Sequence, residues 1–148
     1  MRELFDGLNN YKTKIPNVHA GYLEIMTALE IIMDKNLVSK KEFKKLWSGP
    51  INSLKKFGKT YYFITGYAMR AQAKNYSLKE SIKQAQKKIL DTINWYEKTQ
   101  NEREEANTYY EAALLLPENR NEYIRKGIAL CSQNGYALDL IRFQKLEK

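Results

Sequence analysis

Lysine side chains are concentrated in one part of this chain, between Lys35 and Lys88. Fourteen basic residues and two acids, Glu42 and Glu80, give this segment a charge of +12, which leaves −4 for the rest of a chain whose net charge is +8. Ammonium groups on flexible stems act as point charges toward phosphate oxygens. Positive charge gathered in one segment favours a polyanionic partner, although it indicates no reaction.

We predict that these lysines contact the phosphates of DNA or RNA from exposed helix faces. Arginine, whose planar fork reads guanine, is scarce at six residues, so binding should follow charge and backbone shape rather than base sequence. Stacking on single-stranded bases would have to come from Tyr61, Tyr62, Tyr67 or Tyr76. The candidate contact residues are Lys40, Lys41, Lys44, Lys45, Lys55, Lys56, Lys59, Lys79, Lys83 and Lys87.

The same charge distribution permits a second function, a protein-interaction module that does not touch nucleic acid, such as an adaptor or an inhibitor of a larger partner. Between Glu97 and Glu122 seven acids stand against three bases, so a chain that is basic in its middle could also self-associate head to tail. A small subunit of a nucleoprotein complex would satisfy both hypotheses. Codon bias in an AT-rich genome raises the lysine content of a chain, but it does not explain why acidic residues are nearly absent from residues 35–88.

No residue pattern of a catalytic or cofactor-binding site is recognisable, so we expect neither an enzyme nor a cofactor or metal. Gly-Lys-Thr at 58–60 matches the end of a phosphate-binding loop, but Ser53 stands where that loop needs a glycine. His19 is the only histidine and has no cysteine or carboxylate partner in a recognisable metal-binding pattern. Glu24 and Glu30 are six residues apart, on different faces of a predicted helix, and do not form an acid–base pair.

The single cysteine, Cys131, excludes an intramolecular disulfide and a zinc site built from cysteines. It shares an apolar helical stripe with Ile124 and Ile128, which predicts a buried and unreactive thiol. A lone thiol fits a reducing compartment, so we expect the cytoplasm. The longest apolar region, 22–33, is broken by two glutamates, and acids occupy the first ten residues, so we expect no membrane span and no signal peptide.

The elements that must position these residues are all helices. No stretch alternates apolar and polar residues with period two, and three prolines with seven glycines leave few hairpin turns. We therefore predict one all-α domain over residues 1–148, a compact bundle of about seven or eight helices. Its basic part covers about residues 1–98, and an acidic helical unit covers about 99–148.

The first half of the chain is predicted to form four helices. A short one covers 2–8, and a second, capped by Asn17, covers 17–34. Ser39 and Glu42 have capping-box spacing and open a third helix that ends near Trp47, before a break at Gly49-Pro50. A fourth runs over 51–74, and we expect its second half to be the most buried part of the fold.

The second half of the chain is predicted to form four more helices. Ser77 and Glu80 repeat the capping-box spacing and open a helix over 77–98. Helices over 102–116 and 121–132 follow, and the last begins at Tyr136, after an Asn134-Gly135 pair that favours the left-handed conformation of a helix end.

The C-terminal third resembles a tetratricopeptide repeat, whose second helix carries alanine, an aromatic residue, alanine and then proline at set spacings. The resemblance implies stacked helical hairpins, a packing that antiparallel helices in general also produce. Pro117 comes one residue early, and the preceding helix lacks the expected Trp, Leu-Gly and Tyr positions. The residues that carry the resemblance are Ala106, Tyr110, Ala113, Leu114 and Pro117, loosely echoed by Gly127, Leu130, Tyr136 and Phe143.

Overall fold

The structure, a computed structural model, describes residues 28–29, 32 and 37–147. Within these residues the chain is helical and contains no β-strand, so the predicted all-α class is confirmed. The predicted helices over 2–8 and 17–34 lie outside the described residues, apart from isolated positions such as the buried Leu29. His19, Glu24 and Glu30 lie outside them as well.

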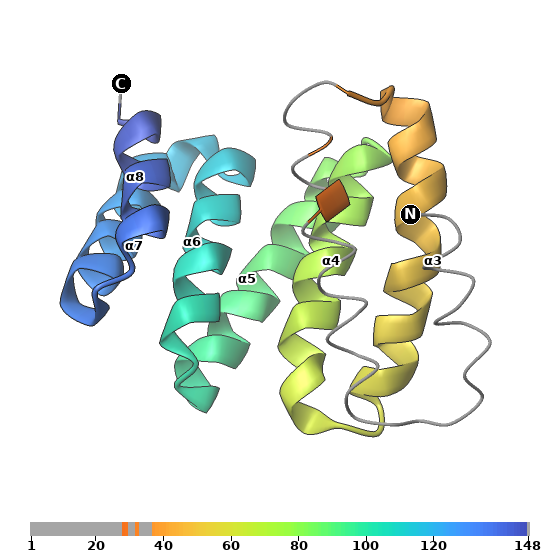
Figure 1. Ribbon diagram of the computed structural model, residues 1–148, viewed down its shortest axis with the longest axis horizontal. Coiled ribbons are helices and arrows are strands. Elements are labelled where there is room, and N and C mark those ends of the chain that lie inside the picture. Colours follow the sequence, from red (N-terminus) through yellow and green to blue (C-terminus); the bar gives the residue numbers. More distant parts are fainter. Residues whose placement is uncertain (1–27, 30–31, 33–36, 148) are drawn as a thin grey trace. The chain divides into compact units, whose positions relative to one another are not determined.

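Six α-helices and two short 3-10 helices follow one another in the described part of the chain (Figure 1). The predicted count of seven or eight included the two helices that lie outside it. The α-helices are α3 (Lys40–Gly58), α4 (Thr65–Leu78), α5 (Ile82–Thr99), α6 (Glu102–Leu115), α7 (Arg120–Asn134) and α8 (Ala137–Leu146). The 3-10 helices are η1 (Tyr62–Ile64) and η2 (Pro117–Asn119).

The chain divides into two compact units, Met1–Ala71 and Gln72–Lys148. The division falls within α4, whereas the sequence placed the change from a basic to an acidic part near residue 98. Because α5 packs on α6, the lysines of α5 belong to the same unit as the acidic first turn of α6. That the whole chain forms one domain stays a prediction.

Helix α3 begins at the predicted capping box. The Ser39 hydroxyl accepts a hydrogen bond from the Glu42 amide, and the Glu42 carboxylate accepts one from the Ser39 amide at 3.0 Å. The predicted break at Gly49-Pro50 is wrong, because α3 continues through a buried Pro50 to Gly58. Proline costs a helix interior about 3 kcal/mol. The apolar face that continues on both sides of Pro50, through Trp47 and Leu54, offsets this cost.

The chain breaks further along, so the predicted single helix over 51–74 is also wrong. Helix α3 ends at Gly58, and α4 begins at Thr65. The Thr65 hydroxyl donates to the Gly58 carbonyl at 3.0 Å, and a Cβ on Gly58 would lie 3.4 Å from the Thr65 Cα. The start of α4 thus packs directly against the end of α3, at a distance that a Cβ at position 58 would also fit.

The part that we expected to be most buried is only partly so. Ile64 and Ala68 are buried, but Tyr62 and Phe63 on η1 are exposed. The 3-10 turn has three residues per turn instead of 3.6, so the side chains along η1 take different directions from those of a continuous α-helix. Tyr62 and Phe63 are therefore exposed, whereas we had expected this segment to be buried.

The capping box predicted at Ser77 and Glu80 does not form. Ser77 lies in the last turn of α4, Glu80 has a positive φ of 62°, and α5 begins at Ile82 behind Ser81. The apolar face of α4 extends to the buried Leu78 and carries the helix past the capping signal.

The second unit packs each helix on its neighbour in sequence, α5 on α6, α6 on α7 and α7 on α8. This is the packing that the predicted helical hairpins require. Helix α7 ends at Gly135, whose φ of 72° confirms the predicted left-handed helix end. A Cβ on Gly127 would lie 2.0 Å from the Phe143 ring, so only glycine lets α8 pack this closely on α7. Phe143 is buried, whereas Ile141 on the same helix is exposed.

Candidate functional site

The continuity of α3 brings two groups of predicted contact residues onto one helix. A helix advances about 100° per residue, so positions 41, 45, 55, 56 and 59 fall within an arc of about 100° on one face. Over this span the helix rises by about 27 Å. We call this set the lysine stripe; it consists of Lys41, Lys45, Lys55, Lys56 and Lys59, the last being the C-cap residue.

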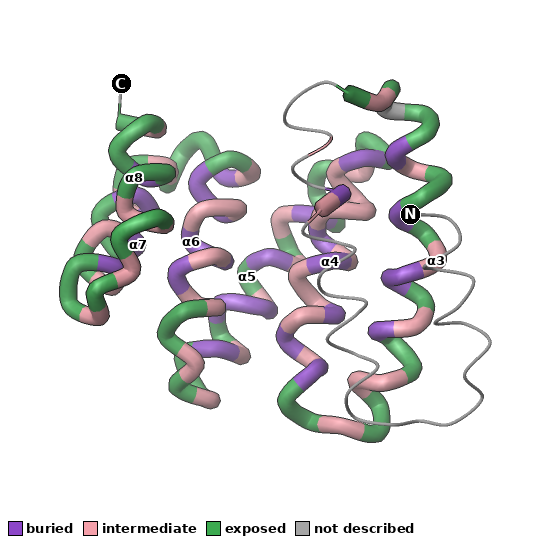
Figure 2. Tube along the Cα trace, in the orientation of Figure 1, coloured by how far each residue is buried: buried purple, intermediate pink, exposed green. Residues whose placement is uncertain are grey.

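The lysine stripe is exposed along its whole length. All five side chains face solvent, as do the neutral Ser48 and Asn52 between them, and Figure 2 shows exposed positions recurring along α3. Lys44 lies at the edge of the stripe and is half-buried. The side chain of Lys40 is outside the described residues.

The opposite face of α3 fixes the direction in which the stripe points. Phe43, Trp47 and Leu54 are fully buried, and the Phe43 and Trp47 rings stack with their centroids 5.1 Å apart. Large buried aromatic side chains bind a helix firmly to its core. Rotating α3 to hide the lysines would expose these rings, so the stripe has a fixed orientation within its unit.

The fold makes little use of the stripe's charge. Across the residues that the structure describes, none of the five ammonium groups forms an ion pair. Lys41 and Lys45, one turn apart, repel each other and lie near the positive end of the helix dipole. The nearby Glu42 is engaged by Ser39, whose hydroxyl and amide lower the pKa of its carboxyl group.

The three remaining predicted contact residues lie in the second unit. Lys79 is in the turn after α4, and Lys83 and Lys87 are one turn apart on α5. All three are exposed.

Two exposed aromatic side chains follow the stripe directly in the chain. Tyr62 and Phe63 on η1 are 64% and 53% exposed. Of the tyrosines proposed for stacking, Tyr62 is thus the exposed one, while Tyr61, Tyr67 and Tyr76 are half-buried. Phe63 was missed, because an unbroken helix would have placed it inside; the helix-ending Gly58 was the signal that pointed elsewhere.

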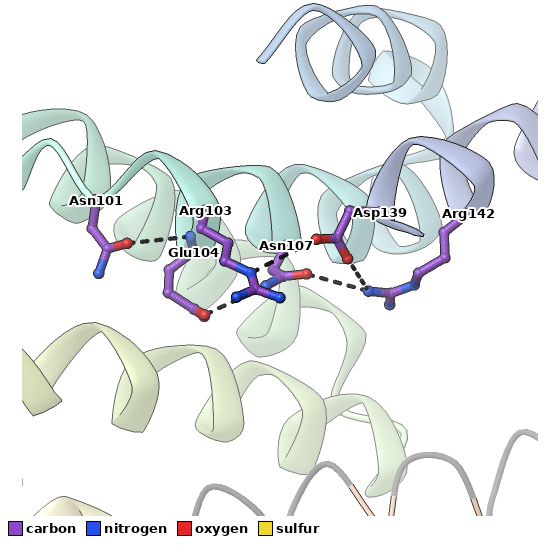
Figure 3. A network of polar contacts seen from close by, with 6 residues as sticks. All are labelled: Asn101, Arg103, Glu104, Asn107, Asp139 and Arg142. Carbon is purple, nitrogen blue, oxygen red and sulfur yellow. Dashed lines mark hydrogen bonds and ion pairs between the residues drawn. The ribbon is translucent and has the colours of Figure 1, made fainter. Parts of the chain in front are cut away.

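The arginines of α6 and α8 are engaged in a polar network within the second unit (Figure 3). Asp139 lies 3.9 Å from Arg103 and 3.4 Å from Arg142. Arg142 also donates to the Asn107 amide oxygen at 3.2 Å and lies 4.2 Å above the Tyr110 ring. This network ties α8 to α6, so the two arginines have a structural role that the lysine stripe lacks. Its remaining members are Asn101 and Glu104.

A second cluster joins acids to aromatic rings between α5, α6 and α7. The Tyr109 hydroxyl donates to Glu105 at 2.7 Å and lies 3.3 Å from Glu97. Burial, then the hydrogen bond with Glu105, raises the pKa of Tyr109 well above its usual range. Lys126 lies 5.8 Å from the centroids of the Tyr109 and Tyr123 rings. The neutral hydroxyl is therefore a hydrogen-bond donor that links helices.

Cys131 is buried, as the apolar stripe predicted, and burial raises the pKa of its thiol. Among the described side chains, no three His, Cys, Asp or Glu residues come together in a way that could hold a metal ion.

In the part of the chain that the structure describes, no helix has both the length and the apolar character needed to cross a membrane.

Comparison of the chain with protein-family models, with curated proteins and with solved structures gives no match.

Proposed function

We propose that the lysine stripe of α3 binds the phosphate backbone of a nucleic acid. The observation that carries the proposal is the alignment of five exposed ammonium groups on one face of a single helix that continues through Pro50. A phosphate backbone presents negative charges at regular intervals along a line, and a straight row of cations complements it. The protein acts by binding, without catalysis or a cofactor.

The cost of the stripe to the fold supports this function. Lys41 and Lys45 repel each other, lie toward the positive end of the helix dipole and form no ion pair among the described residues, so these two lysines destabilise the start of α3 slightly; Lys55 and Lys56, in the last turn, are favoured by the dipole. Phosphates on a bound strand would remove that repulsion. Structural lysines behave differently in the second unit, where the Lys126 ammonium lies 2.8 Å from Glu122.

Lys79, Lys83 and Lys87 form a separate basic group on the second unit, and we propose that they contact phosphates as well. Lys40 and Lys44 flank the stripe. We propose that the protein works in the cytoplasm, alone or as a small subunit of a nucleoprotein complex, with the second unit available to a protein partner.

The test is the salt dependence of binding to DNA and RNA. Five phosphate contacts predict a slope of log affinity against log salt of up to about −4.5 on duplex and −3.5 on single strands. Changing Lys41 and Lys55 to Glu should weaken binding and reduce the slope by about two. The matched control changes Lys98 and Lys145, two exposed lysines outside the candidate set, to Glu with the same change in net charge.

The control variant should bind nearly as the natural chain does. Circular dichroism must show the same helicity for all three proteins. Equal losses in the two variants would mean that net charge alone attracts nucleic acid, and the lysine stripe would not be the site. No binding at low salt by the natural chain would refute the proposed function.

A second candidate, a protein-interaction module, is favoured by two apolar side chains on α8. Leu138 and Ile141 are exposed and lie one turn apart on this helix. Light scattering of the concentrated protein, with Leu138 and Ile141 changed to Gln for comparison, tests association through this face. If both proteins are monomers, self-association through this face of α8 is excluded.

A further inference from the structure

We infer that the nucleic acid bound by the lysine stripe is single-stranded, with bases stacked on Tyr62 and Phe63. The inference rests on the proposed function and names the class of nucleic acid that the same site takes. Tyr62 follows Lys59, the last residue of the stripe, by three residues, and the rings of Tyr62 and Phe63 are both mostly exposed. Cationic and stackable groups thus lie next to each other in the chain.

The rings are held on a fixed support. The amides of Thr60 and Tyr61 donate to the Phe57 carbonyl at 2.9 and 2.7 Å, and the Ile64 amide donates to the Tyr61 carbonyl at 3.0 Å. Ile64 is fully buried and anchors η1 in the core of its unit. A support that is already ordered lowers the entropy lost when a base binds.

Neighbouring rings pack on one another and on Phe63. The Phe57 and Tyr61 rings stack with centroids 6.3 Å apart, and the Tyr61 and Phe63 rings lie 6.0 Å apart in a tilted arrangement. A row of three rings therefore runs from the last turns of α3 to the exposed Phe63. Bases stacked on the exposed parts of Tyr62 and Phe63 would lie close in the chain to Lys59, the last residue of the stripe.

Base stacking on protein rings separates single strands from duplexes. In a duplex each base already stacks on its neighbours, so a ring must enter between base pairs to reach a π-face. Bases of a single strand offer their faces directly, and each stacked base is worth about 5- to 150-fold in affinity. Lysine supplies phosphate contact without base readout, so the site should tolerate many sequences.

Basic and aromatic residues together also occur in membrane-surface helices, but α3 does not present the apolar face that such helices bury in lipid. Most of its apolar face, including Phe43, Trp47 and Leu54, is fully buried in the protein, and Leu46 is its one exposed aliphatic side chain among the described residues. The arc of the stripe itself contains only lysine, Ser48 and Asn52. A nucleic-acid strand is therefore the better match.

The experiment compares three labelled ligands of equal strand length by fluorescence anisotropy; the two single strands also have equal phosphate number, whereas the duplex has about twice as many. The first is a single strand of mixed sequence, about 12 nucleotides long, which is within the range that single-strand binding sites cover. The second is the same strand without its bases, and the third is the duplex of the same sequence. The natural chain should bind the base-bearing strand at least about fivefold more tightly than the strand without bases, and more tightly than the duplex. This comparison needs no variant.

Variants then assign the effect to the rings. Changing Tyr62 and Phe63 to Ala should remove the preference for the base-bearing strand and leave binding of the strand without bases unchanged. Tyr62→Phe with Phe63→Tyr keeps two rings and should keep the preference. Leu138→Ala, at another exposed apolar side chain, is the matched control and should behave as the natural chain.

The outcomes separate this inference from the proposed function. Equal affinity for strands with and without bases, or tighter binding of the duplex, would overturn the single-strand inference and leave the lysine stripe as a phosphate site. Failure to bind any of the three ligands at low salt would overturn both. Phosphatidylserine vesicles form a fourth arm, and ring-dependent flotation with them, without a preference for bases, would assign the rings to a lipid surface instead.

Discussion

Lys41 occupies the first turn of α3, where the backbone amides give the helix its positive end, and Lys45 lies one turn further along the same face. Acidic residues are the stabilising choice at such positions. Glu122 and Asp139 stand in the first turns of α7 and α8, where a negative charge is favoured. The contrast indicates that Lys41 and Lys45 serve something other than the stability of their helix.

Replacing Lys41 with Glu should therefore stabilise the protein while weakening its binding to nucleic acid. The new carboxylate would favour the helix dipole and lie one turn before Lys45, a combination worth about 0.5–1 kcal/mol in the free energy of unfolding. Urea denaturation followed by circular dichroism measures this gain. The same protein should bind a labelled oligonucleotide more weakly and with a smaller salt slope.

Lys145→Glu is the control with the opposite sign. Lys145 lies in the last turn of α8, where a positive charge is favoured, so its replacement should lower stability slightly and leave binding unchanged. A loss of stability in Lys41→Glu would contradict the view that the stripe opposes the fold.

At the scale of the element, α3 depends on Pro50 being tolerated inside a helix. Pro50 lacks the amide that would donate to the carbonyl of Leu46, yet the helix keeps its direction far enough to align both groups of lysines. The residues around it are buried, so packing maintains the helix at this point.

Pro50→Ala should stabilise α3 without disturbing the lysine stripe. Alanine regains about 3 kcal/mol of helix preference, loses about 1.6 kcal/mol with two buried methylenes, and loses about 0.7 kcal/mol from a looser unfolded chain. The expected net gain in the free energy of unfolding is roughly 0.5–1 kcal/mol. Amide hydrogen exchange across α3 should slow, and affinity for the oligonucleotide should not fall.

Pro50→Gly provides the comparison, because glycine regains the hydrogen bond without the helix preference of alanine and should be less stable than alanine by about 1 kcal/mol. If both variants weaken binding, the bend or rigidity that proline gives α3 contributes to the site.

Sequence predicted helices well where a local signal agreed with the apolar pattern around it. Ser39 with Glu42 and the left-handed Gly135 are such positions, and both formed as expected. Sequence failed where a cap or break signal opposed a continuing apolar face. Trp47, Ile51 and Leu54 continue that face past Pro50, and their spacing was visible in the sequence.

The candidate site was predictable in composition and not in arrangement. Of the ten candidate lysines, eight are exposed and Lys44 is half-buried, while the side chain of Lys40 is outside the described residues. Their alignment required knowing that α3 is one helix, which depends on tertiary packing. Phe63 was out of reach for the same reason, since its exposure follows from a turn that the helical periodicity did not show.

At the scale of the whole molecule, the two units use charge differently. In the first, the stripe's cations face solvent, whereas in the second several charges are joined to partners, as in the Arg142–Asp139 and Lys126–Glu122 pairs. Salt screens solvent-exposed cations, but it screens the hydrogen bonds of the buried Tyr109 much less. The stability of the second unit should therefore respond to pH through Tyr109 in particular.

The free energy of unfolding should fall as pH rises above about 10, the ordinary tyrosine pKa. Because the pKa of Tyr109 is raised in the folded state, the unfolded chain loses this proton first, and ionisation then favours unfolding. The stabilisation is complete below the unfolded pKa and is lost above it. Urea denaturation at a series of alkaline pH values measures the slope.

Tyr109→Phe should be less stable at neutral pH, because Glu105 loses its hydrogen-bond donor, and should show a flatter decline at high pH. At acid pH the sign reverses for Glu42 and Glu122, whose lowered pKa values mean that stability is lost as pH falls through them. An alkaline slope that is the same with and without Tyr109 would assign it to other groups, Tyr123 first.

Because Cys131 is buried, its reaction with a thiol reagent can report when the core of the second unit opens. Cys131 is the only thiol in the sequence and is 1% exposed, inside the core that α7 and α8 share with α6. A thiol reagent reaches it only when that core separates, so the alkylation rate counts openings of the second unit and is silent about the first. If added oligonucleotide slows the alkylation of Cys131, binding at α3 lowers the opening rate of helices that carry none of the stripe.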